Sequence, residues 1–281
     1  MPPHTRVVVD STADLPSEWL AHYDIRVIPA YVNFGTESFP DDGVALTHAE
    51  FYRRLAETRV HPTTAAPSLG VTLEILRTAL EGVEQVLALT ISSSFSGINN
   101  VFNLAAKEIG GDRITVIDSG YLSMGLGWQA LAAAKRLHEG GTMADAIAAA
   151  HDVRQRSDVW AAPNDLEFLR RGGRVNALMA GIGTLLQVKP IISLKEGEVR
   201  TIQRVRTMNK AKAALIEMVQ KSAPLQHLAL MHTNDLQGAE MLRDALSFIA
   251  PEDTPIINVG TATGTQFGPG SLGVSIVRKA F

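Results

Sequence analysis

The chain has no cysteine among its 281 residues, which excludes disulfides, thiolate metal ligands and cysteine nucleophiles and suits a reducing compartment. It also lacks an excess of positive charge, because its formal net charge is −3. This charge does not favour nucleic acid or an anionic membrane surface as a partner. Long apolar runs are missing too, so we expect no signal peptide and no membrane span, and we place the protein in the cytoplasm.

The composition that remains is that of a folded protein with a substantial core. Of the residues, 46% are hydrophobic and 20% are charged. The length exceeds that of a usual single domain, so we expect two domains. The longest uncharged segment, 256–277, contains five glycines and Pro269, and there we predict a strand, a loop and a second strand.

The order of the predicted elements indicates an α/β protein whose two halves differ. In the first half, short β-branched runs alternate with helical patterns, which is typical of a parallel sheet covered by helices. In the second half, neighbouring strands mix with helices, and segment 191–199 is predicted to be a hairpin that turns at Glu196-Gly197. We therefore predict a parallel-sheet α/β/α domain at 1–158 and a mixed-sheet α/β domain at 159–281.

Hydroxyl side chains gather directly after the predicted strands of the first half. Segments 10–12, 90–96 and 118–119 follow strands, and a fourth polar turn, 63–70, precedes a helix. In an open parallel sheet, the carboxyl ends of strands and the amino ends of helices face one crevice, where ligands bind. Helix amino termini carry unpaired N–H groups and partial positive charge. Such an edge would suit an anion.

The simpler interpretation is that each Ser or Thr caps its own helix or turn. We favour capping for Ser11, Thr12, Ser68 and Ser119. The turn at 90–96, with four serines, has more donors than one cap uses, so there we favour ligand contact. No charged side chain occurs from Val86 to Ala106, and a polyphosphate site normally brings a Lys and a magnesium-holding carboxylate. The expected ligand group is thus a carboxylate.

Enzymatic alternatives find little support in the residues. A serine hydrolase elbow needs G-x-S-x-G, but Ser94 has no glycine two residues before it. The opening VVVDST is similar to an aspartyl nucleophile motif at Asp10, yet the second acid that such a phosphohydrolase needs is replaced by Thr12. No His and acid spacing indicates a metal site. We expect a protein without catalytic activity, metal or cofactor.

Seven motifs in order along nearly the whole chain resemble those of the DegV family, bacterial fatty-acid-binding proteins that include the lipid-carrying subunits of fatty acid kinase. The motifs are VVVDSTADLP (7–16), TTAAPSLG (63–70), ISSSFSGINN (91–100), VIDSGYLSMGLG (116–127), LEFLRRGGRV (166–175), LLQVKPIISLKEGEV (185–199) and GTQFGPGSLG (264–273). The resemblance implies a three-layer α/β/α domain followed by a mixed-sheet α/β domain, with a long-chain fatty acid buried between them.

The resemblance also implies roles for individual residues. Hydroxyls that would bind the fatty acid carboxylate are Thr63, Thr64, Ser93, Ser94 and Ser96. Arg174 would supply a basic group to the same head, whereas Arg170 and Arg171 are expected to form a solvated helix end. Arg206 would contact the ATP-binding subunit of a fatty acid kinase, which would phosphorylate the presented carboxyl group. The same picture leaves room for a transient membrane contact.

One position departs from the family pattern. Where the family often has His, this chain has Gln266, which can donate a hydrogen bond but cannot become cationic. Weaker head-group binding, a changed ligand or loss of the kinase role would each be compatible with this change. Two further functions therefore stay open: a lipid-sensing module that reports to another protein, and a self-sufficient phosphotransferase or hydrolase.

Overall fold

The computed structural model describes residues 4–58, 60–173 and 188–280, and the chain divides into two compact units. Unit 1 consists of Met1–Tyr31 and Ala65–Gln155, and unit 2 of Val32–Thr64 and Arg156–Phe281. The domains expected from the sequence were two continuous ranges divided after residue 158. In the structure, segment Val32–Thr64 groups with unit 2 although unit 1 surrounds it in the sequence.

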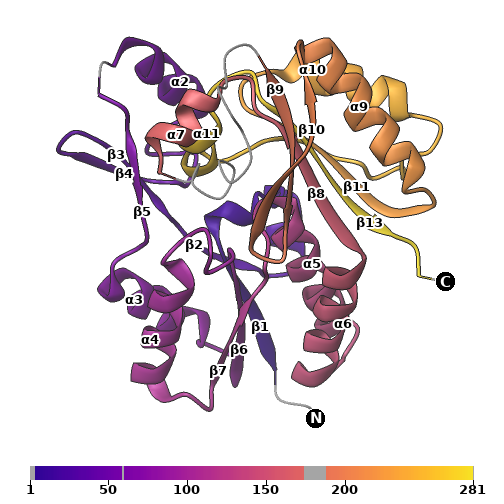
Figure 1. Cartoon of the computed structure of the whole chain (residues 1–281). Coiled ribbons are helices and arrows are strands. Elements are labelled where there is room, and N and C mark those ends of the chain that lie inside the picture. Colours follow the sequence, from indigo (N-terminus) through magenta and orange to yellow (C-terminus); the bar gives the residue numbers. More distant parts are fainter. Residues whose placement is uncertain (1–3, 59, 174–187, 281) are drawn as a thin grey trace. The chain divides into compact units, whose positions relative to one another are not determined.

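Unit 1 has the predicted parallel sheet, with strand order β2-β1-β6-β7. Its strands are β1 (Thr5–Asp10), β2 (Arg26–Ile28), β6 (Gln85–Thr90) and β7 (Ile114–Asp118). Its helices are α1 (Ser17–His22), α3 (Leu69–Ala79), α4 (Ile98–Gly110), α5 (Met124–His138) and α6 (Met143–Arg156), with a short 3-10 turn at Ser11–Ala13. Helices α3 and α4 lie on one side of the sheet and α5 and α6 on the other (Figure 1), which gives three layers.

The sequence explains why both faces of this sheet are covered. Strand β1 carries three consecutive valines, all buried, so it needs apolar neighbours above and below. One of these faces packs against small residues of α5 and α6, including Ala130 and Ala146, which let the helices approach closely. On this side, the rings of Trp19 and Trp128 lie 5.5 Å apart, between α1 and α5.

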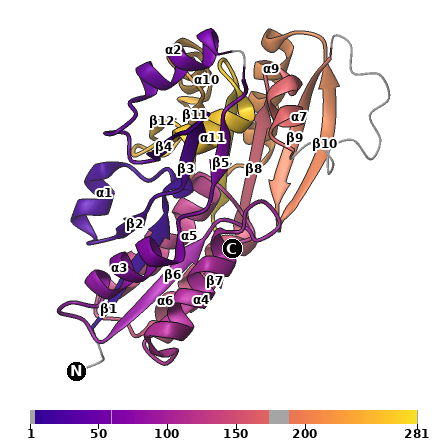
Figure 2. The same ribbon diagram turned by 90° about the vertical axis from the view of Figure 1, so that its left-hand side faces the viewer.

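Unit 2 contains a six-stranded mixed sheet in the order β10-β9-β8-β13-β11-β12. Its strands are β8 (Ser157–Ala162), β9 (Lys189–Lys195), β10 (Glu198–Val205), β11 (Leu225–His232), β12 (Ile256–Asn258) and β13 (Leu272–Arg278). Only the β11 and β12 pair among these described strands is parallel. The predicted hairpin is confirmed as β9–β10 (Figure 2), and both turn residues, Glu196 and Gly197, have positive φ as a two-residue hairpin turn requires.

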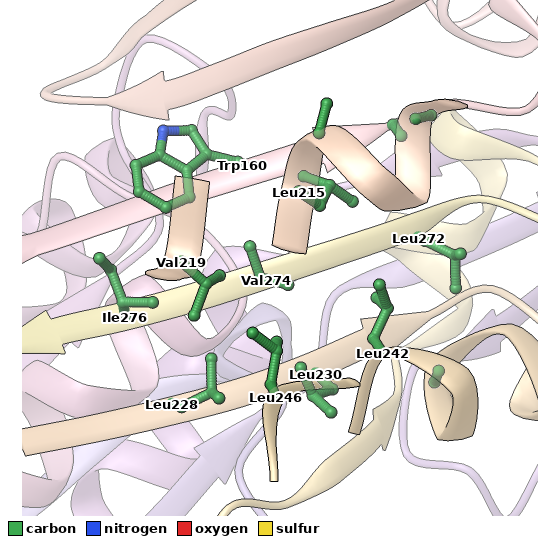
Figure 3. Close-up of a cluster of buried hydrophobic side chains, with 14 of the residues drawn as sticks. Trp160, Leu215, Val219, Leu228, Leu230, Leu242, Leu246, Leu272, Val274 and Ile276 are labelled. Atoms are coloured by element: carbon green, nitrogen blue, oxygen red, sulfur yellow. The ribbon is translucent and has the colours of Figure 1, made fainter. Parts of the chain in front are cut away.

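Two helices, α9 (Met208–Lys221) and α10 (Leu236–Leu246), cover one face of the six-stranded sheet. Figure 3 shows Leu215 and Val219 of α9, and Leu242 and Leu246 of α10, pointing at the strands. Apolar side chains of β8, β11 and β13 complete this core, among them Trp160, Leu228, Leu230, Leu272, Val274 and Ile276. Burial of this apolar surface holds unit 2 together, at roughly 1.5–3 kcal/mol for each large side chain.

Segment 32–64 forms most of a second, three-stranded sheet and is bonded to residues 259–261 of unit 2. The sheet has the order β4-β3-β5, with β3 (Tyr31–Phe34), β4 (Glu37–Pro40) and β5 (Thr63–Ala65), and α2 (His48–Glu57) lies between β4 and β5 in the sequence (Figure 2). Asp41 accepts hydrogen bonds from Thr261, and His48 Nε2 lies 3.0 Å from the Val259 carbonyl oxygen. These bonds join partners more than 200 residues apart in the sequence.

The segment predicted as strand, loop and strand contains a helix in place of the loop. Helix α11 (Thr261–Phe267) connects β12 to β13 and contacts α7 (Leu166–Arg171). Gly264 lies within α11, where a Cβ would come within 2.8 Å of Tyr52 Oη and 3.0 Å of Phe51 Cε1. Close packing on α2 thus explains a glycine that suggested a loop. Within the described residues, no helix combines the length and apolar character needed to span a membrane.

Candidate functional site

The carboxyl ends of three parallel strands in unit 1 bring polar groups to one edge. Strand β1 ends at Asp10, β6 at Thr90 and β7 at Asp118. Thr90 is the register partner of Asp118, and Val9 that of Leu89, so the three ends lie at the same level. The turns that follow them therefore meet at this edge, as the sequence predicted for a parallel sheet. We call residues 91–97, which follow β6, the serine loop.

Asp10 is fully buried beneath the serine loop. Its Oδ1 accepts the Thr12 N–H at 3.0 Å and the Thr12 hydroxyl at 2.5 Å, and its Oδ2 accepts the Ile91 N–H at 2.6 Å. Both carboxylate oxygens are thus occupied, as a buried charge requires. This is the arrangement of a structural carboxylate and not that of an exposed nucleophile.

Asp118 holds the same loop from the other neighbouring strand. Its Oδ2 accepts the Ser93 N–H at 3.1 Å, and its Oδ1 accepts the Gly120 N–H at 2.8 Å. The second bond closes the local turn after β7, whereas the first crosses to the serine loop. The Arg154 guanidinium donates to the Asp118 main-chain carbonyl oxygen and brings a positive charge near this aspartate.

The main-chain N–H groups from Ile91 to Ser96 all have acceptors: those of Ile91, Ser92 and Ser93 bond outside the serine loop, and the next three bond within it. The N–H groups of Phe95 and Ser96 both donate to the Ser92 carbonyl oxygen, and the Ser94 N–H lies 3.3 Å from the Ser92 hydroxyl. The Ser96 hydroxyl accepts the Ile98 N–H at the start of α4, and its own hydrogen can still be donated. These N–H groups are therefore not available to a ligand in this conformation.

Two hydroxyls of the loop differ from the others. Ser93 and Ser94 are exposed, and their hydroxyls make no hydrogen bond to any residue that the structure describes, whereas Ser92 is buried. A hydroxyl can donate to a carboxylate or accept from a protonated head. Unit 1 thus offers a pair of adjacent alcohols on a rigidly held loop.

The other hydroxyls for which we favoured capping all bond to groups within unit 1. Ser68 caps α3 through the Val71 N–H, and Ser119 exchanges hydrogen bonds with the main chain of Tyr121. The Ser11 hydroxyl accepts the Ala30 N–H next to β2. The Thr12 hydroxyl donates to Asp10. Capping is confirmed for Ser68, and the other three have structural partners.

The remaining hydroxyl candidates lie on β5 in unit 2. Thr63 is exposed, and its hydroxyl lies 3.5 Å from Asn33 Nδ2. The Thr64 hydroxyl accepts a hydrogen bond of 3.2 Å from Gln266 Nε2, so the structure brings these two predicted residues together within unit 2. The Gln266 side chain packs on Gly172, where a Cβ would lie 1.8 Å from Gln266 Oε1. Gly172 is thus required for this placement of the amide.

Asp41 fixes the helix that carries Gln266. It is buried, and its Oδ1 accepts both the Thr261 N–H at 2.7 Å and the Thr261 hydroxyl at 2.8 Å at the start of α11. Gly260 lies directly against it, since a Cβ there would come within 2.8 Å of the Asp41 carboxylate. The position of Gln266 therefore depends on a residue far away in the sequence.

Two histidines of unit 2 are kept neutral by their surroundings. Burial lowers the pKa of His61, with Arg171 adding to this effect, and burial also lowers the pKa of His232. His232 Nδ1 accepts the Asp235 N–H at 3.1 Å, which places its proton on Nε2. His61 lies two residues before Thr63, with its ring 5.7 Å from that of Phe168.

The basic candidates have different environments. Arg170 and Arg171 both bind Glu167, and these bonds lower the pKa of Glu167 to about 2, so the predicted solvated helix end is confirmed. Arg206 follows β10 and is exposed. Arg174 lies outside the described residues. Within the described part of the chain, no group of three His, Cys, Asp or Glu residues is placed to hold a metal ion.

The fold and these residues define a class: an α/β protein with one parallel and one mixed sheet, and with hydroxyl-rich turns at the ends of its parallel strands. Residues 4–279 match the family described as uncharacterised protein, DegV family. The chain belongs to the DegV family, as the seven motifs predicted, and its fold class is also confirmed.

Several relatives have been described as fatty-acid-binding proteins. The structure of a DegV family protein from Thermus thermophilus, described as one of fatty acid binding, has a TM-score of 0.90 and 31% identity and covers 99% of each chain. DegV from Bacillus subtilis, described as a fatty acid binding protein, has a TM-score of 0.87 and 26% identity, covering 99% of this chain and 100% of the other. A DegV domain-containing protein of Halalkalibacterium halodurans is 33% identical over 274 residues, 96% of each chain.

Asp41 and Asp118 were missed by the sequence analysis as supports of the candidate residues, and Asp10 was considered only as a nucleophile. A signal exists for Asp10 and Asp118, because an acid directly after a β-branched run stands where a parallel strand ends. No such signal exists for Asp41, which lies in a turn whose partner is on α11.

Proposed function

We propose that this protein binds a long-chain fatty acid and holds its carboxyl head with side-chain hydroxyls. The observation that carries the proposal is the pair of exposed hydroxyls, Ser93 and Ser94, on a loop whose N–H groups at positions 91–96 all have acceptors. The descriptions of relatives with 26–31% identity support the choice of ligand. The residues proposed for the head group are Thr63, Thr64, Ser93, Ser94, Ser96, Arg174 and Gln266.

The tail of such a ligand would dominate its affinity. Burying about fourteen methylenes at ~0.8 kcal/mol each contributes roughly 11 kcal/mol before the cost of ordering. A hydrogen bond to a charged head adds only about 1.5–3 kcal/mol. The hydroxyls would therefore set the orientation of the ligand and the preference for an acid.

Native mass spectrometry of the gently purified protein tests the proposal directly. We expect a protein mass increased by that of a fatty acid, and uptake of oleate or palmitate by delipidated protein. If neither the purified nor the loaded sample carries a fatty acid, the proposal is wrong.

Variants of the serine loop test the head-group residues. Ser93→Ala and Ser94→Ala should each weaken binding of the fatty acid by roughly tenfold and leave the binding of a fatty alcohol of equal length nearly unchanged, since the tail is the same. Ser247→Ala is a matched control, because this exposed serine caps only the end of α10, where its hydroxyl donates to the Asp244 carbonyl oxygen. Equal losses for acid and alcohol would argue against a head-group role.

We further propose that the bound acid is presented to a separate ATP-binding kinase subunit, with Arg206 at the contact. The exposure of Arg206 on unit 2 is consistent with such a contact. The test is acyl-phosphate formation from loaded protein, ATP and a kinase subunit of this type. Arg206→Ala should lower the rate without changing lipid affinity, and Arg243→Ala on α10 is the control. Turnover of ATP by this chain alone would contradict the proposal.

A further inference from the structure

The serine loop is held from both sides by carboxylates on the two strands next to β6. Asp10, at the end of β1, accepts the N–H of Ile91, the first residue of the loop. Asp118, at the end of β7, accepts the N–H of Ser93. The two bonded loop positions are two residues apart, and Ser94 follows directly. We call Asp10 and Asp118 the carboxylate clamp.

The bonds of the clamp are of the strong kind. Both acceptors are carboxylate oxygens, and a hydrogen bond to a carboxylate is about twice as strong as one between neutral groups. Asp10 is fully buried and has no other oxygen to offer, because its Oδ1 already serves Thr12. The position of Ile91 is thereby fixed relative to β1, and that of Ser93 relative to β7.

The clamp also decides which groups of the loop face outward. Once the Ser93 N–H points at Asp118 and the Ser94 N–H at the Ser92 hydroxyl, the loop can no longer bind an anion with its main chain. The side-chain hydroxyls of Ser93 and Ser94 are then the groups presented to solvent. A loop released from Asp118 would sample conformations in which this pair is not aligned.

We propose that Asp118, supported by Asp10, is a positioning residue that orients the Ser93 and Ser94 hydroxyls for head-group recognition. Neither aspartate contacts the ligand in this proposal, which rests on the proposed function. The clamp lowers the entropy cost of ordering the two hydroxyls when they bond to the head group, and it leaves the contribution of the tail unchanged. It therefore raises the preference for a fatty acid over a fatty alcohol of equal length.

Asp118 is the residue to change, because it is only half-buried, whereas loss of the fully buried Asp10 endangers folding. In Asp118→Ala, both bonds are lost. We expect roughly tenfold weaker binding of palmitate, a similar fall in the preference for palmitate over hexadecanol, and little change in hexadecanol affinity. Amide hydrogen exchange of Ser93 without ligand should become faster.

Asp118→Asn separates the clamp from the local turn. The N–H groups of Gly120 and Ser93 bond to different oxygens of Asp118. In asparagine an NH₂ group replaces one of these oxygens, so one of the two N–H groups loses its acceptor. Exchange rates of the two amides report which bond survives. If the Ser93 amide stays protected from hydrogen exchange in this variant, we expect the preference for palmitate over hexadecanol to be kept, and if it loses protection, we expect the preference to fall. A preference that depends on protection of the Gly120 amide instead would show that the local turn matters and not the clamp, and would overturn the proposal.

Asp145→Ala is the matched control within unit 1. Asp145 also accepts the N–H and the hydroxyl of a threonine, Thr142, at 2.8 and 2.7 Å, but it lies at the start of α6, beyond the far end of α5. It should lower stability slightly and leave selectivity intact. Wild-type selectivity in Asp118→Ala would overturn the clamp while leaving fatty acid binding established. Absence of fatty acid binding in the wild type would refute the proposed function and the clamp together.

Discussion

Two buried aspartates, one in each unit, hold the segments that carry the candidate residues, but they connect different parts of the chain. Asp10 in unit 1 and Asp41 in unit 2 each accept the N–H and the hydroxyl of one threonine with a single oxygen. For Asp10 the threonine is two residues away, and the second oxygen reaches across to the serine loop at Ile91. For Asp41 the threonine is 220 residues away and begins α11.

The difference shows how the two sets of candidate residues are supported. In unit 1 the support follows from the strand order, because β1 and β7 are the neighbours of β6 in the sheet. In unit 2 it depends on a turn after β4 meeting a helix from the end of the chain. The serine loop is thus fixed by sheet topology, whereas Gln266 is fixed by packing between distant segments.

The substitution of Asp10 by asparagine tests the support of the serine loop and should have the largest effect on stability. In Asp10→Asn, the amide oxygen can keep both Thr12 bonds, and the NH₂ group then faces the Ile91 N–H. This buried donor loses its acceptor, so we expect a loss of about 3 kcal/mol in the free energy of unfolding.

Chemical denaturation of Asp10→Asn and the wild type measures this loss. The variant should shift the denaturation midpoint without changing the slope with denaturant concentration. A midpoint equal to that of the wild type would show that the Ile91 N–H does not need Asp10, and the serine loop would then not be fixed from β1.

Glycine substitutions test the same difference between the units with a smaller effect on the free energy of unfolding. Gly264 of α11 has no room for a Cβ, because Tyr52 and Phe51 of α2 are in contact with it, whereas Gly97 of the serine loop has φ −73° and nothing within 4 Å of a Cβ. Gly264→Ala should therefore cost about 2 kcal/mol through overpacking. Gly97→Ala should change the free energy of unfolding by less than about 0.5 kcal/mol.

Thermal unfolding of the two glycine variants provides the measurement. We expect a clear fall in Tm for Gly264→Ala and a Tm close to that of the wild type for Gly97→Ala. If Gly264→Ala is tolerated, α11 must be able to move away from α2, and Gln266 is then less firmly held than the contacts indicate.

Much of unit 1 could be predicted from the sequence, because its information is local. The valine run of β1 and the capping serine Ser68 each report on their own element, and the parallel order brings the strand ends together. The serine loop could be singled out for the same reason. Which of its hydroxyls remain available could not be predicted, since this depends on the bonds of Ser92 and Ser96.

The parts that escaped prediction in unit 2 depend on long-range contacts. Helix α11 was predicted as a loop because segment 256–277 contains five glycines and Pro269. The contact with α2 that requires one of these glycines, Gly264, is not visible in the sequence. Segment 32–64 was placed in the first domain by its position in the chain. The bonds from Asp41 and His48 to 259–261 place it in unit 2.

The smallest expected effect is on the pH dependence of stability, through the buried His232 of unit 2. Burial lowers the pKa of His232 from its usual 6.5, and the nearby His48 adds to this effect while Asp235 opposes it. The unfolded chain then binds more protons than the folded protein below about pH 6.5. Stability is therefore complete above this pH and decreases as the pH falls through the folded-state pKa.

His232→Asn isolates this contribution, because an asparagine oxygen can accept the Asp235 N–H in place of Nδ1 and does not titrate. The fall in Tm between pH 7.5 and pH 5 should be smaller in this variant than in the wild type. If His232→Asn and the wild type lose the same stability on acidification, protonation of His232 does not destabilise unit 2.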